Sequence, residues 1–207
     1  GGGLKLSHSS NTIRRNLFQD NSAGGPGGGI ALDNEWSDVT DCDFIDNHAG
    51  RGGGMQIWRN EDPITISNCT FIGNTAGFCG GGLQLDNNDE LVTFENVLLN
   101  DNHSNNDGGA ICSESYMWDD DLTEEDILEN PNQTECGMLE CPAQFEIINS
   151  AIWDNTANDD GAGIYMRLGS AALENTVIYG NNAPDQGAGV AVKADGHVSL
   201  VNTIVSG

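Results

Sequence analysis

The sequence contains few basic residues, few aromatic residues and no long apolar run. Only seven of its 207 residues are Lys or Arg, whereas 32 are Asp or Glu, and the formal net charge is −25 at pH 7. This charge repels phosphate backbones and anionic headgroups, so nucleic acids and membrane surfaces are poor partners, whereas divalent cations, basic proteins and neutral glycans are compatible with it. No apolar stretch approaches the ~20 residues that span a bilayer, so we expect no transmembrane segment.

The sequence is rich in glycine and poor in aromatic residues. The chain has 28 Gly and only 6% aromatic residues, which argues against a single thick hydrophobic core. Its 37% hydrophobic content is nevertheless too high for a disordered chain. A fold that reuses tight backbone positions in a repeating unit satisfies both observations.

Two repeating signatures run through the chain in phase. The first, three small residues followed by an apolar one, occurs at residues 1–4, 27–30, 52–55, 80–83, 108–111, 161–164 and 187–190. The second is an apolar residue with Asn three places later; its apolar anchors are Phe18, Phe44, Phe71, Leu99, Ile152 and Ile178, with Val205 as a seventh. The anchors recur every 26 to 28 residues, except for a gap of 53 between Leu99 and Ile152. The period indicates one domain, residues 1–207, of about seven coils.

Each repeat contains three short runs in which apolar and polar residues alternate, a pattern typical of strands with one buried face. In the third repeat the inward pairs are Met55/Ile57, Ile64/Ile66 and Cys69/Phe71. Strands this short have to stack on neighbouring repeats to bury their apolar faces. The pattern therefore predicts an all-β fold, a right-handed parallel β-helix whose coils rise ~4.8 Å each.

The recurring Asn is expected at a corner of each coil, where its amide can bond to the same amide one coil above and below. The predicted ladder consists of Asn21, Asn47, Asn74, Asn102, Asn155 and Asn181. The Gly run marks another corner, at which positive φ or close backbone approach excludes a Cβ. We interpret both features as architectural.

The two signatures resemble the paired motifs, Gly-Gly followed by an apolar residue and Phe-x-x-Asn, of the chlamydial polymorphic outer-membrane protein repeats and of related bacterial and algal β-helix repeats. The resemblance covers nearly the whole chain apart from residues ~113–141. It implies a pectate-lyase-like solenoid on a cell-surface or secreted adhesin. The later repeats depart from it, because Leu99, Ile152 and Ile178 replace the Phe.

The wide gap between anchors contains an insertion, residues 113–141, that interrupts the repeat and is expected to project as a loop. It is acidic and rich in potential oxygen ligands: Asp119, Asp120, Asp121, Glu124, Glu125 and Asp126. These could hold Ca²⁺, although their spacing matches no EF-hand and a solvated acidic loop is the simpler interpretation. We expect no other cofactor.

Six cysteines and three Asn-x-Ser/Thr sequons favour an extracellular or cell-surface location. Cys42 and Cys69 should stack in adjacent coils, either as a disulfide or as small buried residues. Cys112 and Cys141 flank the insertion and would clamp its base if bonded, leaving Cys79 for Cys136, but sequence cannot choose the connectivity. No C-x-x-C pair exists, so metal binding by these thiols is not expected. Among the sequons, Asn132 is expected to be most accessible, Asn68 next, and Asn102, a ladder residue, least.

Two classes of function are compatible with this fold, an enzyme and a binding or structural rod, because solenoids of this kind are known to serve as either. A lyase acting on uronates needs basic residues that the chain lacks, and a hydrolase needs carboxylates on one face. Asp154, Asp159 and Asp160 are candidates, but Asp recurs at corners throughout. We therefore expect no enzyme and no catalytic residue, with a polysaccharide hydrolase or lyase as the alternative.

Outward positions beside the anchors become apolar late in the chain, which usually marks a contact surface. The predicted interaction surface consists of Ile45, Ile72, Trp153 and Tyr179. We expect an extracellular structural or adhesive rod that binds a glycan or cell-surface protein or self-associates laterally or head to tail. It would be either a segment of a larger surface protein or the subunit of a filament.

Overall fold

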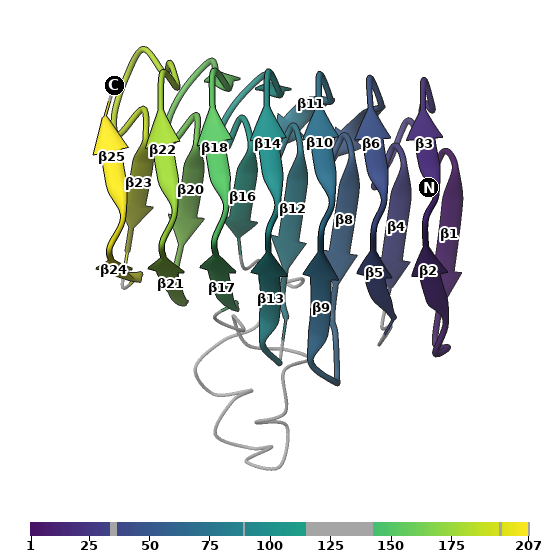
Figure 1. Ribbon diagram of the computed structural model, residues 1–207. Helices are drawn as coiled ribbons and strands as arrows, with labels where there is room; N and C mark the ends of the chain where they lie inside the picture. The colour runs from purple at the N-terminus through teal and green to yellow at the C-terminus, as the bar shows by residue number, and fades with distance from the viewer. Residues whose placement is uncertain (34–36, 89, 115–142, 195, 207) are drawn as a thin grey trace, which may run out of the picture.

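The computed structural model describes residues 1–33, 37–88, 90–114, 143–194 and 196–206 (Figure 1). These residues form a parallel β-solenoid, and none of them lies in a helix. Figure 1 shows the chain rising on the front face, crossing the top, descending at the rear and advancing from right to left, which is a right-handed coil. The expected fold class is therefore confirmed.

Four parallel sheets run along the coil axis, and each takes one strand from successive coils. Sheet A contains β1 (Leu4–Ser7), β4 (Ile30–Asp33), β8 (Met55–Trp58), β12 (Leu83–Asp86), β16 (Ile111–Glu114), β20 (Ile164–Arg167) and β23 (Val190–Lys193). Sheet B contains β2 (Thr12–Arg14), β5 (Asp38–Thr40), β9 (Ile64–Ser67), β13 (Val92–Glu95), β17 (Gln144–Ile148), β21 (Ser170–Glu174) and β24 (His197–Val201).

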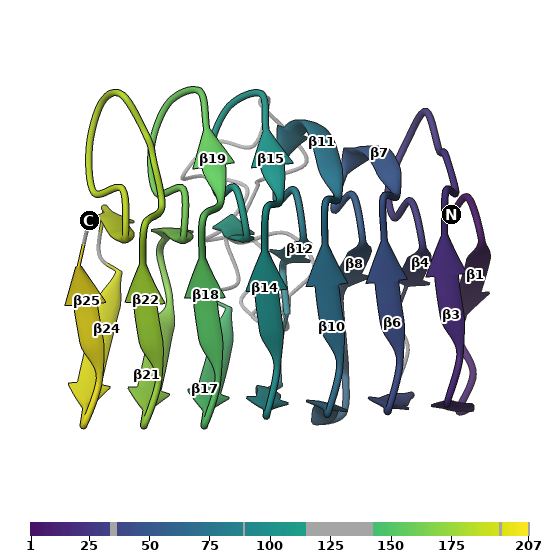
Figure 2. The same cartoon turned by 45° about the horizontal axis from the view of Figure 1, so that its top comes forward.

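Sheet C contains β3 (Leu17–Gln19), β6 (Asp43–Ile45), β10 (Thr70–Ile72), β14 (Leu98–Asn100), β18 (Ala151–Trp153), β22 (Val177–Tyr179) and β25 (Ile204–Ser206). The shorter sheet D, formed by β7 (His48–Arg51), β11 (Thr75–Cys79), β15 (His103–Ser104) and β19 (Thr156–Ala157), lies along the connection from sheet C to sheet A (Figure 2). The chain closes about six turns, slightly fewer than the seven coils expected, because the seventh strand of each large sheet ends the last turn.

The core is a set of stacked columns inside the coil. Phe44 packs on Phe71 with ring centroids 4.5 Å apart and planes 2° from parallel, and on Phe18 at 5.1 Å. Leu99, Ile152 and Ile178 continue the column in register and are wholly buried. Val205 holds the same register but is 43% exposed, because only one neighbouring coil covers it. Strand pairing thus builds a continuous core from residues that no single repeat could bury.

Tight corners explain the glycine content. Gly52 has a φ of +58°, and a Cβ there would lie 2.3 Å from the carbonyl oxygen of Met55. The equivalent glycines at the start of five other runs share the positive φ: Gly27, Gly80, Gly108, Gly161 and Gly187. At the corner after sheet C the left-handed backbone is adopted by Asp or Gly, residues that tolerate it.

Candidate interaction surface and buried polar rows

The Asn ladder lies inside the coil, at the corner between sheets C and D. Asn74 Nδ2 donates to Asn102 Oδ1 at 3.0 Å and to the Phe44 carbonyl at 2.9 Å, while Asn74 Oδ1 accepts from the backbone and side chain of Asn47. The same contacts run from Asn21 to Asn181. Asn47, Asn74, Asn102 and Asn155 are wholly buried. Every amide is engaged within the chain, so the ladder holds the corner together and offers no site to a ligand.

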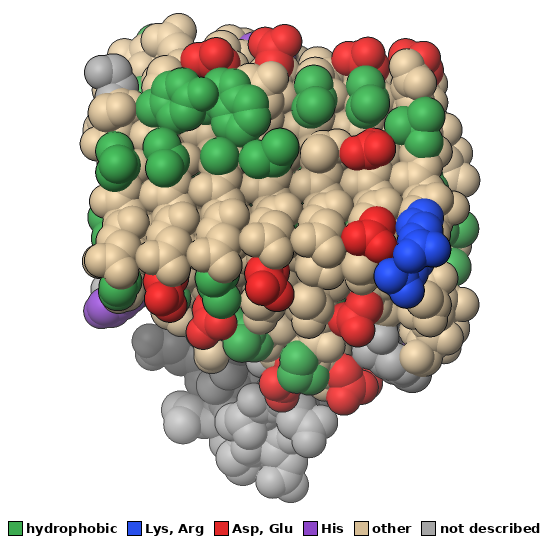
Figure 3. All heavy atoms as spheres, in the orientation of Figure 1, with side chains coloured by type: hydrophobic (Ala, Val, Ile, Leu, Met, Phe, Trp, Pro, Cys, Tyr) green, Lys and Arg blue, Asp and Glu red, His purple; other side chains and the backbone are tan. Residues whose placement is uncertain are grey.

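The outer face of sheet C carries two parallel columns of mostly apolar side chains. Register places Ile45, Ile72, Trp153 and Tyr179 in one column, interrupted by Asn100. The second column is interrupted by two polar residues and contains Leu17, Asp43, Thr70, Leu98, Ala151, Val177 and Ile204. We call the apolar members of the two columns the sheet C face. Figure 3 shows these side chains as two rows over sheet C.

Aromatic side chains concentrate toward the C-terminal coils of the sheet C face. The Trp153 and Tyr179 rings stack with centroids 6.0 Å apart and planes 4° from parallel. Tyr179 is 42% exposed, Leu98 40% and Ile72 36%. The structure thus brings the four residues of the predicted interaction surface onto one flat face.

A row of aspartates borders the sheet C face. Asp20, Asp46, Asp101 and Asp154 directly follow sheet C strands, and each has positive φ. Figure 3 shows carboxylates along this margin. Among the described residues, none of the four forms an ion pair, so their charges face solvent beside the apolar columns. We call them the aspartate row.

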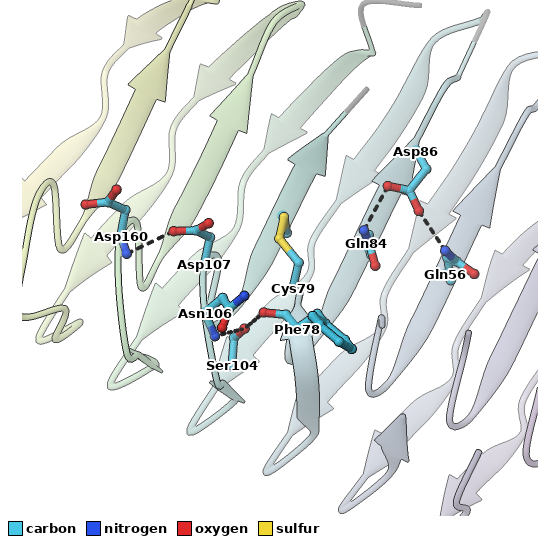
Figure 4. The surroundings of a disulfide bond; sticks show 10 residues. Gln56, Phe78, Cys79, Gln84, Asp86, Ser104, Asn106, Asp107 and Asp160 are labelled. Atoms are coloured by element: carbon cyan, nitrogen blue, oxygen red, sulfur yellow. Dashed lines mark hydrogen bonds between the residues drawn. A yellow bond between two sulfur atoms is a disulfide. The ribbon is translucent and has the colours of Figure 1, made fainter. Parts of the chain in front are cut away.

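The outer side of sheet A carries polar side chains that are buried. Gln56 and Gln84 both donate to Asp86, at 2.6 and 2.8 Å, and Asp86 is only 5% exposed. Glu114 occupies the same position one coil further along, is 8% exposed, and has an Oε2 without a hydrogen-bond partner. Figure 4 shows Gln56 and Gln84 on either side of Asp86. Sequence reasoning missed this pair, although both positions sit three residues after a Gly-run apolar residue.

Burial raises the pKa of both carboxyls in this row. Desolvation raises the pKa of Asp86 to about 6. The hydrogen bonds from Gln56 and Gln84 and the positive charge of Arg51 lower this pKa, but they only partly offset the desolvation. Desolvation also raises the pKa of Glu114 to about 7, and the negative charge of Asp86 adds to it. The two groups therefore retain protons at pH values where exposed carboxyls are ionised.

The structure selects one of the cysteine pairings that the sequence left open. A disulfide joins Cys79 of β11 to Cys112 of β16, with Cα atoms 5.7 Å apart, so Cys112 is not left for Cys141 (Figure 4). Cys42 and Cys69 are buried free thiols, the second of the two alternatives that the sequence left open for them. Burial raises the pKa of Cys69 to about 12, which keeps it protonated. Sequence could not choose this connectivity because it depends on how sheet D folds over sheet A.

The remaining expected sites fall into three groups. Asn68 lies exposed at a corner, whereas Asn102 is wholly buried in the ladder, where a glycan cannot be attached without opening the coil. Ser113 and Glu114 belong to β16, so the expected insertion starts two residues later than its assigned boundary. Outside the described residues lie Asn132, Cys136, Cys141 and the insertion carboxylates Asp119, Asp120, Asp121, Glu124, Glu125 and Asp126.

Fold and surface define a class, the parallel β-solenoid with an exposed apolar face. A family model described as the Chlamydia polymorphic membrane protein repeat matches residues 96–114, which span β14, β15 and β16. This match and the solenoid confirm the resemblance to these repeats. No curated protein matches the chain, and no solved structure does either. Within the described residues, no helix is long and apolar enough to cross a membrane.

Proposed function

We propose that the chain is a surface-associated β-solenoid rod that works as an adhesive element by docking a protein partner on the sheet C face. The family resemblance supports a surface location, because chlamydial repeats of this kind are associated with the outer membrane and cell surface. The observation that carries the proposal is the stacked Trp153–Tyr179 pair within an exposed apolar face on a chain of charge −25. Apolar patches of this kind on otherwise polar surfaces usually serve contact.

Charge complementarity identifies the kind of partner. The aspartate row places a carboxylate beside the apolar columns in four coils, without a cation from the described residues to neutralise it. A partner that presents Lys or Arg next to apolar side chains satisfies both features. A second copy of this chain does not, because it brings 32 acidic residues and only seven basic ones to the contact.

The experiment compares binding of labelled synthetic peptides by fluorescence anisotropy. A peptide of alternating Lys and Leu should bind the wild type, whereas alternating Lys and Ser or Glu and Leu should bind far more weakly. The double variant Trp153→Asp, Tyr179→Asp should lose binding, because it places charge where desolvation is required. Phe78→Asp is the matched control: Phe78 is 56% exposed but lies in β11, away from sheet C.

Three outcomes would overturn the proposed partner. Equal binding of the Lys–Ser peptide would show that charge alone acts, and unchanged binding by the double variant would remove the sheet C face from the contact. Concentration-dependent dimerisation abolished by the same double variant, measured by sedimentation, would assign the face to a second copy. Circular dichroism and melting confirm that each variant is folded.

One observation favours a polysaccharide hydrolase as the second candidate. Asp86 and Glu114 occupy paired positions in adjacent coils, and their raised pKa values suit proton transfer near neutral pH. Both are more than nine-tenths buried, which disfavours access by a polymer. Hydrolysis of any glycan in a screen, lost in Asp86→Asn and Glu114→Gln, would establish this activity.

A further inference from the structure

Three carboxylates meet where two neighbouring coils leave sheet D and enter the Gly corner. Asp107 precedes the corner at Gly108, and Asp159 and Asp160 precede the corner at Gly161 one coil further along. The backbone N–H of Asp160 donates to Asp107 Oδ1 at 3.0 Å, which fixes the two coils relative to each other (Figure 4). One carboxylate oxygen from each of the three residues lies within 4.8 Å of the others.

The Asp160 carboxylate is incompletely satisfied although it is enclosed. Its side chain is 0% exposed, and Oδ1 has no hydrogen-bond donor. Lys193 Nζ contacts Oδ2 from a side chain that is itself 44% exposed. A buried carboxylate oxygen without a donor is costly, so a cation beside Oδ1 would stabilise the folded chain.

Repulsion within the cluster leads to the same conclusion. The three carboxylates approach within 4.8 Å of one another, and Lys193 pairs with Asp160. Three carboxylates thus face a single ammonium group, which leaves the cluster with excess negative charge. A bound cation would remove both the repulsion and the unsatisfied oxygen.

We propose that Asp107, Asp159 and Asp160 bind a divalent cation, Ca²⁺, that ties two adjacent coils together at the Gly corner. The ligand set is all oxygen, which suits a hard cation rather than Zn²⁺. Oxygens within 4.8 Å of one another fit around Ca²⁺, whose ligand distances are about 2.3–2.6 Å, and a set of several carboxylates suits Ca²⁺ better than Mg²⁺, which usually keeps several waters. Asp159 is exposed, so the ion can enter from solvent.

The site differs from the acidic insertion and from the sheet C face. Its side chains come from the connection between β15 and β16 and from the connection between β19 and β20, two segments of adjacent coils. Asp160 faces the outer side of sheet A, where Lys193 also packs near the Tyr165 ring at 5.8 Å. An ion here stabilises the folded coil by binding it and not the unfolded chain.

The test measures the melting temperature of the full chain in Ca²⁺ and in a chelator, together with Tb³⁺ luminescence sensitised by tyrosine. Ca²⁺ should raise the melting temperature, and Tb³⁺ should give saturable emission that Ca²⁺ displaces. Asp159→Asn should remove most of the Ca²⁺-induced shift while folding normally, since the residue is exposed. Tyr165→Phe should reduce Tb³⁺ emission without changing the Ca²⁺-induced shift.

Two control variants make the result specific. Asp154→Asn changes an exposed aspartate of the same coil outside the cluster and should leave the shift intact. The triple variant Asp119→Asn, Asp120→Asn, Asp121→Asn removes insertion carboxylates and should also leave it intact. The proposal is overturned if Ca²⁺ produces no shift in the wild type, if Asp159→Asn keeps the full shift, or if only the triple variant abolishes it.

Discussion

Single asparagines hold successive coils together at the interior corner. Each ladder amide donates to the next Asn and to the carbonyl of the anchor residue one coil back, and accepts from the previous Asn. Buried polar groups left unpaired cost about 1–3 kcal/mol each, so the ladder is stabilising only as a complete set. One substitution therefore affects three coils.

Asn74→Ala should lower the free energy of unfolding by about 3 kcal/mol, because the Phe44 carbonyl, the Asn47 side-chain amide and the Asn47 backbone N–H each lose a hydrogen bond. Urea unfolding followed by circular dichroism measures it. Asn100→Ala, which removes one hydrogen bond on the outer side of sheet C, is the control and should cost less than half as much. Equal losses of unfolding free energy in the two variants would mean that the interior ladder contributes no more to stability than a surface hydrogen bond.

Phe71→Ala should destabilise the protein by about 3–5 kcal/mol, since the side chain is wholly buried and stacks on Phe44 at 4.5 Å. Phe78 is the matched aromatic outside the core, 56% exposed beside Arg51, and its replacement by Ala should change stability little. Thermal and denaturant unfolding compare the two. A loss below about 1 kcal/mol at Phe71 would contradict a packed aromatic column.

At the scale of strands, one disulfide fastens sheet D to sheet A. Cys79 in β11 and Cys112 in β16 are 33 residues apart, so the bond restricts a loop of that length in the unfolded chain. Chain entropy predicts a stabilisation of about 3–4 kcal/mol for such a loop. Reduction of the wild type should lower the melting temperature, whereas the Cys79→Ser, Cys112→Ser variant should already be lowered and should not respond to reductant. A response in that variant would assign the effect to another cysteine.

The buried row on sheet A gives stability a particular pH dependence. In the folded protein the pKa values of Asp86 and Glu114 are raised to about 6 and about 7. At any pH between the ordinary carboxyl pKa of about 4 and these raised values, the native state therefore binds more protons than the unfolded state. Their contribution is fully present below pH ~4 and is lost as pH rises through about 6 to about 7. Unfolding free energy should therefore fall over this interval, and Asp86→Asn with Glu114→Gln should flatten the fall. A steeper profile in the double variant would contradict the assignment.

At the scale of the whole molecule, net charge opposes compactness. A charge of −25 concentrates repulsion on a narrow rod, and only four ion pairs appear among the described residues. Raising NaCl from about 0.02 to about 0.5 M should raise the melting temperature by screening this repulsion. Sucrose at matched osmolality is the uncharged control for solvent effects. A lower melting temperature in salt would show that local ion pairs outweigh the net charge.

Sequence alone determined the period, the strands and the interior columns. Phe44, Phe71 and Leu99 share a register because in-phase coils bring residues one period apart together, and the Asn three places later reaches the same corner each time. The same logic places Trp153 and Tyr179 side by side on the outside. These features follow from a repeat length, so they can be read without knowing how the sheets face one another.

Tertiary structure decided everything that depends on contacts between different positions of the repeat. The Cys79–Cys112 bond joins two different positions of the repeat. Asp86 and Glu114, like Asp107 and Asp160, occupy equivalent positions of adjacent coils, and what the tertiary structure adds there is their burial. The repeat length determines which residues stack along the coil axis, but it does not determine the angle through which the chain turns at each corner. Desolvation, and with it the raised pKa values, arises only once that bend encloses the side chains.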